Sequence, residues 1–122
     1  MKIFVTGGCG FIGSNFILNQ MHQTINHILN VDKLTYAGNP ENLETIIDDP
    51  KYNFVHGNIC DFKLLKKLIQ TFQPDGIINF AAESHVDRSI DEPMEFIHTN
   101  VLGTATLLNA TLEYIRENTK TK

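Results

Sequence analysis

The sequence has 122 residues and a formal net charge of −4, with 42% hydrophobic and 20% charged residues. This length fits one domain with one hydrophobic core, and the composition is typical of a globular protein, not of a disordered chain. The negative charge argues against a nucleic-acid groove, and no apolar run is long enough to span a membrane. The first residues lack the apolar region of a signal peptide, so we expect a cytoplasmic protein.

Short apolar runs alternate with longer helical patterns along the chain, as in a parallel sheet covered by crossover helices. In chain order, the first half contains a strand at residues 2–6, a helix at 11–22, a strand at 27–31 and a short helix at 42–48. The second half contains a strand at 52–56, a helix at 61–72, a strand at 77–80 and a long helix at 93–116. Asp61 is expected to cap its helix, Pro93 to begin the last one, and the polar tail from residue 117 to fray.

Four strands and four helices fit one open sheet. Right-handed crossovers place the first strand centrally, in the spatial order 3-2-1-4, which predicts an α/β fold of the Rossmann type with helices on both faces. This arrangement corresponds to one mononucleotide-binding half of a Rossmann fold plus the first strand of the second half. The fourth strand would then be an apolar edge, and such edges pair with other strands. We therefore expect a chain that belongs to a longer protein or depends on a partner.

A glycine-rich loop joins the first strand to the first helix. Gly7 permits the tight turn, Gly10 lets the backbone approach a pyrophosphate, and Gly13 allows close packing of helix on strand. The helix N-terminus directs free N–H groups at the phosphates. Cys9 stands in the same loop, where a small side chain is required. A tight turn without a ligand is the alternative, but the three glycines would then only weaken the unit, so we predict a dinucleotide site.

Asp32 follows the second strand, where a carboxylate accepts hydrogen bonds from both ribose hydroxyls and repels a 2′-phosphate. This position predicts NAD in preference to NADP. The adjacent Lys33 would soften that repulsion. The alternative is that Asp32 only caps a turn.

Four blocks of the sequence resemble a known family. Residues 6–14 are similar to the glycine motif of the extended short-chain dehydrogenases/reductases. Residues 32–39, 81–89 and 99–104 resemble the dTDP-glucose 4,6-dehydratases within that group. The resemblance covers essentially the whole chain. It implies an NAD-dependent hydro-lyase that oxidises a dTDP-glucose at C4, eliminates water across C5 and C6, and returns the hydride to C6. A UDP-sugar epimerase or decarboxylase of the same family is the alternative.

The same resemblance implies a set of cofactor contacts in addition to the three glycines. They are Phe11 and Ile12 at the pyrophosphate; Asp32, Lys33, Leu34 and Thr35 around the adenosine ribose; Asn58 and Ile59 at the adenine; and Phe80, Ala81, Ala82, Glu83, Ser84 and Thr99 along the rest of the cofactor. Ser84 would also reach the sugar substrate. The family usually has aspartate at Asn58. Asparagine still offers an acceptor oxygen but adds an amide donor, so we expect a tolerated change with at most some loss of adenine affinity.

The catalytic residues that the resemblance implies are a Thr, a Tyr-x-x-x-Lys pair and an Asp-Glu pair, and nothing here matches them. Tyr114 is followed at the fourth position by Asn118, not by lysine. In the family these residues come later, so we expect residues 1–122 to be the NAD-binding N-terminal portion of an enzyme and inactive alone. A non-catalytic NAD-binding or interaction module is the alternative.

Two further expectations concern charged and apolar groups. His85 and Asp87 have no third partner for a metal, so no metal site is predicted, and ion pairs around Asp87 and Arg88 are the alternative to a ligand role for this cluster. The last helix is apolar on more than one side. Because members of the family commonly dimerise through helices in this region, the resemblance implies a homodimer formed through the last helix.

Overall fold

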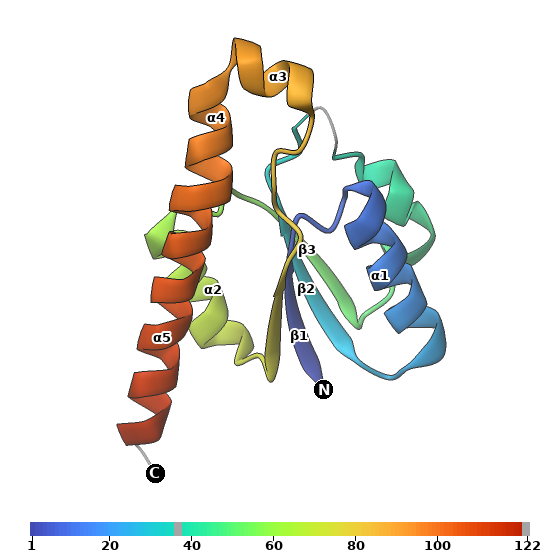
Figure 1. Ribbon diagram of the computed structural model, residues 1–122. Coiled ribbons are helices and arrows are strands. Elements are labelled where there is room, and N and C mark those ends of the chain that lie inside the picture. Colours follow the sequence, from blue (N-terminus) through green and yellow to red (C-terminus); the bar gives the residue numbers. More distant parts are fainter. Residues whose placement is uncertain (36–37, 121–122) are drawn as a thin grey trace.

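The strands form one parallel sheet in the computed structural model, which describes residues 1–35 and 38–120 (Figure 1). They are β1 (Lys2–Thr6), β2 (His27–Asp32), β3 (Tyr52–His56) and β4 (Gly76–Asn79). Their order is β3-β2-β1-β4, with every neighbouring pair parallel, which confirms the predicted topology. Tyr36 and Ala37, inside the block 32–39 that carried part of the resemblance, lie outside the described residues.

Helical segments cover both faces of this sheet. In chain order they are α1 (Phe11–Gln23), η1 (Pro40–Ile46), α2 (Phe62–Phe72), α3 (Val86–Asp91), α4 (Pro93–Ile97), η2 (His98–Gly103) and α5 (Thr104–Lys120). Figure 1 shows α1 and η1 on one face and α2 and α5 on the other. The Asp61 side chain accepts a hydrogen bond from the N–H of Leu64 (3.1 Å), as predicted for a cap, and Pro93 begins α4.

The two central strands are rich in apolar residues and are buried on both faces, as is typical of parallel sheets that helices cover on both sides. Successive side chains point to opposite faces. Val5 and Ile28 therefore pack with Ile17 of α1, whereas Phe4 and Leu29 pack against α2 and α5. Two layers of core result, and the carboxyl ends of all four strands meet at one edge of the sheet.

Three predictions about helices need correction. The short helix α3 was not predicted, because its residues are exposed on every side and give no apolar period. The last helix does run unbroken from Pro93, but it contains a wider π-helical turn at η2. It also continues to Lys120 and does not fray at residue 117, because Glu117 accepts a hydrogen bond from Gln70 (2.6 Å) and lies 3.5 Å from Lys66, both on α2.

The π turn packs directly on the segment that follows β3. Gly103 lies so close to Ile59 that a Cβ atom there would overlap the isoleucine side chain. The Sγ of Cys60 donates to the carbonyl oxygen of His98 (3.2 Å). The long helix is thereby held against the carboxyl edge of the sheet.

Candidate functional site

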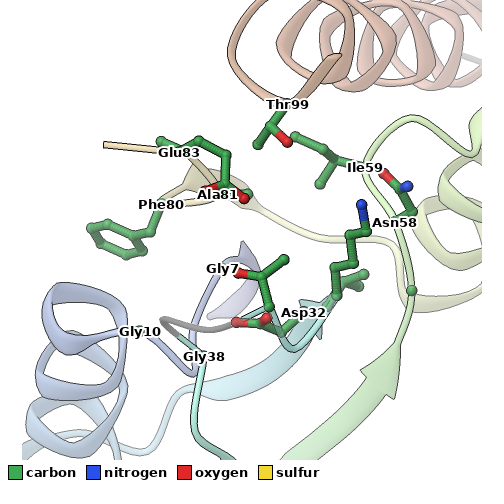
Figure 2. Close-up of a pocket in the computed structure, with 15 residues that line it drawn as sticks. Gly7, Gly10, Asp32, Gly38, Asn58, Ile59, Phe80, Ala81, Glu83 and Thr99 are labelled. Carbon is green, nitrogen blue, oxygen red and sulfur yellow. The ribbon is translucent and has the colours of Figure 1, made fainter. Parts of the chain in front are cut away.

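A cavity opens at the carboxyl ends of the strands (Figure 2). It lies beside the position where the strand order reverses between β1 and β4, which is where ligands bind in open α/β sheets. The residues that line it are Gly7, Gly10, Val31, Asp32, Lys33, Thr35, Gly38, Gly57, Asn58, Ile59, Phe80, Ala81, Ala82, Glu83 and Thr99.

The glycine loop forms one wall of the cavity. Gly7 has a φ of 71°, and a Cβ atom there would overlap the backbone of Ala81. At Gly13 a Cβ atom would overlap the carbonyl oxygen of Gly7. Gly10 differs, since the nearest atom to a Cβ there is 3.6 Å away. Gly7 and Gly13 are therefore required by the fold, whereas Gly10 leaves room for a ligand.

The N-terminus of α1 begins at this open position. Gly10 is the cap residue, and within the described part of the chain no side chain accepts a hydrogen bond from the first N–H groups of the helix. An uncapped helix N-terminus offers backbone donors and a positive dipole to an anion. The loop therefore fits a pyrophosphate, both in its donors and in the space beside Gly10.

Asn30, in the middle of β2, fixes the loop from below. Its side chain is fully buried and makes three contacts. The Oδ1 atom accepts from the N–H of Gly8 (3.0 Å), and Nδ2 contacts the hydroxyl of Tyr52 (3.1 Å) and the Sγ of Cys9 (3.5 Å). Sequence reasoning missed this residue, although an asparagine inside an otherwise apolar strand is a signal for a buried polar network.

Burial keeps the neighbouring groups of this network neutral. It raises the pKa of Cys9 to about 11, with the charge of Asp32 acting in the same direction. Burial likewise raises the pKa of Tyr52 to about 12. Both groups therefore remain protonated near neutral pH, and Cys9 is a packing residue and not a reactive thiolate.

Asp32 binds the protein backbone as well as facing the cavity. One carboxylate oxygen accepts from the N–H of Cys9 (2.8 Å), and the other accepts from the N–H of Leu34 (2.7 Å). The turn-capping role is thus present, with Leu34 at a φ of 59°. Each carboxylate oxygen has a second lone pair, so Asp32 can still accept hydrogen bonds from a ribose in the cavity.

The carbonyl oxygen of Cys9 joins the loop to the segment after β2. It accepts from the N–H of Asn39 (3.0 Å) and from Nδ2 of Asn42 (3.1 Å). Together with the bond to Asp32, these contacts fix Cys9 at both its N–H and its carbonyl oxygen. The expected pyrophosphate and ribose positions therefore belong to one hydrogen-bonded unit.

The expected adenine position lies between the end of β3 and η2. The Oδ1 of Asn58 accepts from the N–H of Cys60 (2.9 Å), so this side chain stabilises its own turn. An aspartate would make the same bond, which explains how the asparagine is accommodated. Oδ1 keeps a second lone pair and Nδ2 offers two donors, so Asn58 can both accept from a ligand and donate to it.

The segment after β4 is held by paired asparagines. The Oδ1 of Asn79 accepts from the N–H of Ala81 (3.0 Å). Asn100 in η2 accepts from the N–H of Glu83 and donates to its carbonyl oxygen, both at 2.8 Å. The ring of Phe80 packs on Phe16 with centroids 5.4 Å apart. The opposite wall of the cavity is therefore fixed as firmly as the glycine loop.

Most of the residues predicted to contact a cofactor line this cavity, and Figure 2 shows several of them facing it. Phe11, Ile12, Gly13, Leu34 and Ser84 do not line it. Phe11, Ile12 and Ser84 are exposed, Gly13 is buried under the loop, and the side chain of Leu34 packs against the core. The lining residues that sequence reasoning missed are Val31, Gly38 and Gly57, of which Gly57 was recognisable as a glycine directly after a strand.

The cluster after β4 contains an ion pair at Arg88, which is part of what its alternative interpretation predicted. Arg88 lies 3.6 Å from Glu92, one helical turn later. Within residues 1–35 and 38–120, no group of three His, Cys, Asp or Glu side chains could hold a metal ion. No helix in this part of the chain is long and apolar enough to cross a membrane.

Comparison with known proteins gives consistent results. The family profile described as GDP-mannose 4,6 dehydratase matches residues 4–122. The chain is 47% identical over 114 residues to dTDP-glucose 4,6-dehydratase from Salmonella typhimurium, covering 93% of this chain and 32% of that protein. It thus spans about a third of the length of the curated relatives that it matches.

Solved structures give the same picture. A dTDP-glucose 4,6-dehydratase from Streptomyces venezuelae with NAD bound has a TM-score of 0.87 and 44% identity, covering 93% of this chain and 36% of that one. UDP-glucose 4-epimerase from Thermotoga maritima has a TM-score of 0.83 and 30% identity, covering 93% and 35%. The fold is therefore common to both kinds of enzyme, whereas sequence identity is higher to the dehydratase.

Proposed function

Since the chain belongs to the GDP-mannose 4,6-dehydratase family, we propose that it is the NAD-binding part of a dTDP-glucose 4,6-dehydratase. The observation that carries this proposal is the cavity between the glycine loop and Asp32, with open space at Gly10 and an uncapped helix N-terminus beside it. These features provide the hydrogen-bond donors and acceptors that a dinucleotide requires.

Each part of the cavity has a role in this proposal. The backbone of the α1 N-terminus holds the pyrophosphate, and Asp32 accepts from the ribose hydroxyls. Asn58 and Ile59 bound the adenine, while the segment from Phe80 to Glu83 directs the cofactor across β4. The bound NAD would supply the hydride acceptor for oxidation of the sugar at C4. This chain's residues bind and orient it, and Ser84 lies beyond the cavity, where it would meet the sugar.

Sequence identity favours a dehydratase function over an epimerase function. Curated dTDP-glucose 4,6-dehydratases are 44–51% identical to the chain. The epimerase structures are 27–30% identical at similar TM-scores. A UDP-sugar epimerase or decarboxylase is therefore the second candidate.

The proposal extends to the organisation of the parent protein. Residues 1–122 would be its N-terminal NAD(P)-binding domain, and turnover would need catalytic residues from outside this segment. We also propose a cytoplasmic homodimer formed through the last helix. An apolar stripe along α4, η2 and α5, at least 42% exposed at each position, supports this assembly: Met94, Ile97, Val101, Leu108, Leu112 and Ile115.

Calorimetric titration of the chain with NAD tests the proposal directly. We expect saturable one-site binding, lost in Gly7→Ala and weakened in Asp32→Asn, which keeps the shape of the side chain but removes its charge. No heat of binding with a folded chain would contradict the proposal. In a separate assay, the chain alone should not dehydrate dTDP-glucose. Turnover would contradict the assignment of catalysis to residues outside the chain and would favour a complete enzyme.

A further inference from the structure

A lysine occupies a position in the cavity where a cation would favour NADP. Lys33 directly follows Asp32 and lines the cavity. Sites for NADP place a basic side chain near this strand end to accept the 2′-phosphate. The presence of Lys33 therefore conflicts with the NAD preference that Asp32 predicts, unless another group cancels its charge.

Glu95 is that group. Its Oε2 atom lies 3.5 Å from Nζ of Lys33 and joins the end of β2 to α4. The carbonyl oxygen of Lys33 accepts a hydrogen bond from Nε2 of His56 (2.9 Å), so the lysine backbone is anchored and only its side chain can change partner. Glu95 lies in a neighbouring cleft whose lining includes Thr35 and Glu83, which also line the main cavity.

The balance of charge in the cavity depends on this pair. Among the described lining residues, Lys33 carries the one positive charge, and Asp32 and Glu83 carry the carboxylates. While Lys33 pairs with Glu95, a 2′-phosphate in the cavity would be repelled by the carboxylates without a compensating cation. When Glu95 is neutralised, the Lys33 ammonium group is free to contact the 2′-phosphate, and one nearby negative charge is gone.

We propose that Glu95 is a specificity-determining residue, which holds the Lys33 ammonium group at α4 and so keeps the cofactor site selective for NAD over NADP. This inference rests on the proposed function, because it assumes that the cavity binds the adenosine end of a dinucleotide. It adds a residue outside the cavity wall to the Asp32 carboxylate as a determinant of cofactor choice.

The size of the effect follows from the exposure of the pair. Both side chains are about half exposed, at 46% and 50%, so solvent screens their attraction. Exposed ion pairs change equilibria by up to about fivefold. Since a phosphate dianion feels both the loss of the carboxylate and the release of the lysine, we expect the ratio of NADP to NAD affinity to rise about three- to tenfold when Glu95 is neutralised.

The test uses Glu95→Gln, with Glu92→Gln as the matched control. Glu92 is also a glutamate of this region, but it pairs with Arg88 and not with Lys33. Dissociation constants are measured by calorimetry for NAD and NADP, and for 5′-AMP and adenosine 2′,5′-bisphosphate, which report on the adenosine end alone. We expect Glu95→Gln to tighten the two 2′-phosphorylated ligands and to leave the other two within about twofold. Glu92→Gln should leave unchanged both the ratio of NADP to NAD affinity and the ratio of adenosine 2′,5′-bisphosphate to 5′-AMP affinity.

A second pair of variants, both lacking Lys33, separates the two causes of the expected gain in affinity for 2′-phosphorylated ligands. In Lys33→Gln/Glu95→Gln the gain relative to Lys33→Gln should shrink to the smaller part that comes from the lost Glu95 carboxylate, and the gain in Glu95→Gln should shrink in high salt. A ratio unchanged in Glu95→Gln while the original chain binds NAD overturns this inference alone. A gain of the same size with and without Lys33 also overturns it. Failure of the original chain to bind NAD overturns the proposed function and this inference together.

Discussion

The central strands and the segments from β4 onward differ in how completely this chain covers them. In β1 and β2 every residue after the first is buried, and the buried polar side chains Thr6, Asn30 and Asp32 all have hydrogen-bond partners. By contrast, α3 and α4 bury no residue, and β4 is only partly covered. Buried polar groups with fixed partners are therefore a feature of the central strands, whereas exposed side chains are a feature of α3 and α4.

This difference separates changes that destroy the site from changes that affect association. A substitution beneath the glycine loop leaves a buried donor without a partner or forces two backbones apart. A substitution on the exposed stripe of the last helix meets only solvent in the chain itself. The predictions below test this separation.

Gly7→Ala should have the largest effect. The alanine would need a positive φ and would overlap the backbone of Ala81, so β1 and the segment after β4 would have to separate. We expect NAD binding to be lost and the free energy of unfolding to fall by at least about 2 kcal/mol. Urea denaturation and calorimetry measure the two quantities.

Gly10→Ala is the matched control for that loop. Its Cβ has ordinary contacts, so stability should change by less than about 1 kcal/mol, while NAD affinity should still fall because the methyl group enters the phosphate approach. Equal loss of stability in both variants would contradict the distinction between the two glycines.

Asn30→Leu should be the next most damaging substitution. It keeps the branching and the number of heavy atoms of the side chain but leaves the N–H of Gly8 and the hydroxyl of Tyr52 without their partner. We expect a loss of about 2 kcal/mol in the free energy of unfolding. Asn53→Leu is the control, because Asn53 is exposed on β3, and this variant should change stability by less than about 1 kcal/mol. Comparable losses in the two variants would refute the importance of the buried network.

Alkaline pH should weaken the same region. The pKa of Cys9 is raised from 9.0 to about 11 and that of Tyr52 from 10.0 to about 12, so the unfolded chain releases these protons first. Stability from this source is therefore fully present below pH 9 and is lost as pH rises toward 12. Urea titrations across this range should give a falling free energy of unfolding, less steep in Tyr52→Phe. Identical slopes would argue against the contribution of Tyr52.

Leu108→Glu should have the smallest effect on folding. This side chain is 64% exposed, so stability should change by less than about 0.5 kcal/mol. If the last helix forms the proposed dimer, the same variant should sediment as a monomer. Asn109→Glu adds the same charge at the next, also exposed, position and should leave association unchanged. Dimers that persist in Leu108→Glu would place the interface elsewhere.

Much of this fold follows from local patterns in the sequence. The strands β1 to β3 were predicted within a residue or so because apolar runs bounded by glycine or polar turns are local signals, and the sheet order followed from crossover handedness. Asp61 was identifiable as a cap for the same reason. By contrast, α3 has no apolar period, and a π turn inside a long helix leaves the sequence pattern almost unchanged.

The site was predictable only in part. The glycines and Asp32 are found by their spacing, because one loop and one strand end set their positions. The role of Asn30 depends on Gly8 and Tyr52, and the role of Glu95 depends on Lys33, so both arise from contacts between distant segments. Asp32 illustrates the limit, since its two interpretations, ribose acceptor and turn cap, prove compatible in one carboxylate.

The π turn at η2 also affects how the family could vary in length. A π turn corresponds to one residue inserted into an α-helix, so deleting a residue between 98 and 103 would restore a regular helix. The deletion would rotate everything before it by about 100° about the helix axis relative to α5. Thr99 would then turn away from the cavity and Glu95 away from Lys33, while α5 stayed packed on α2. A single-codon deletion here would thus act as a change of helical phase, not as a shortened loop.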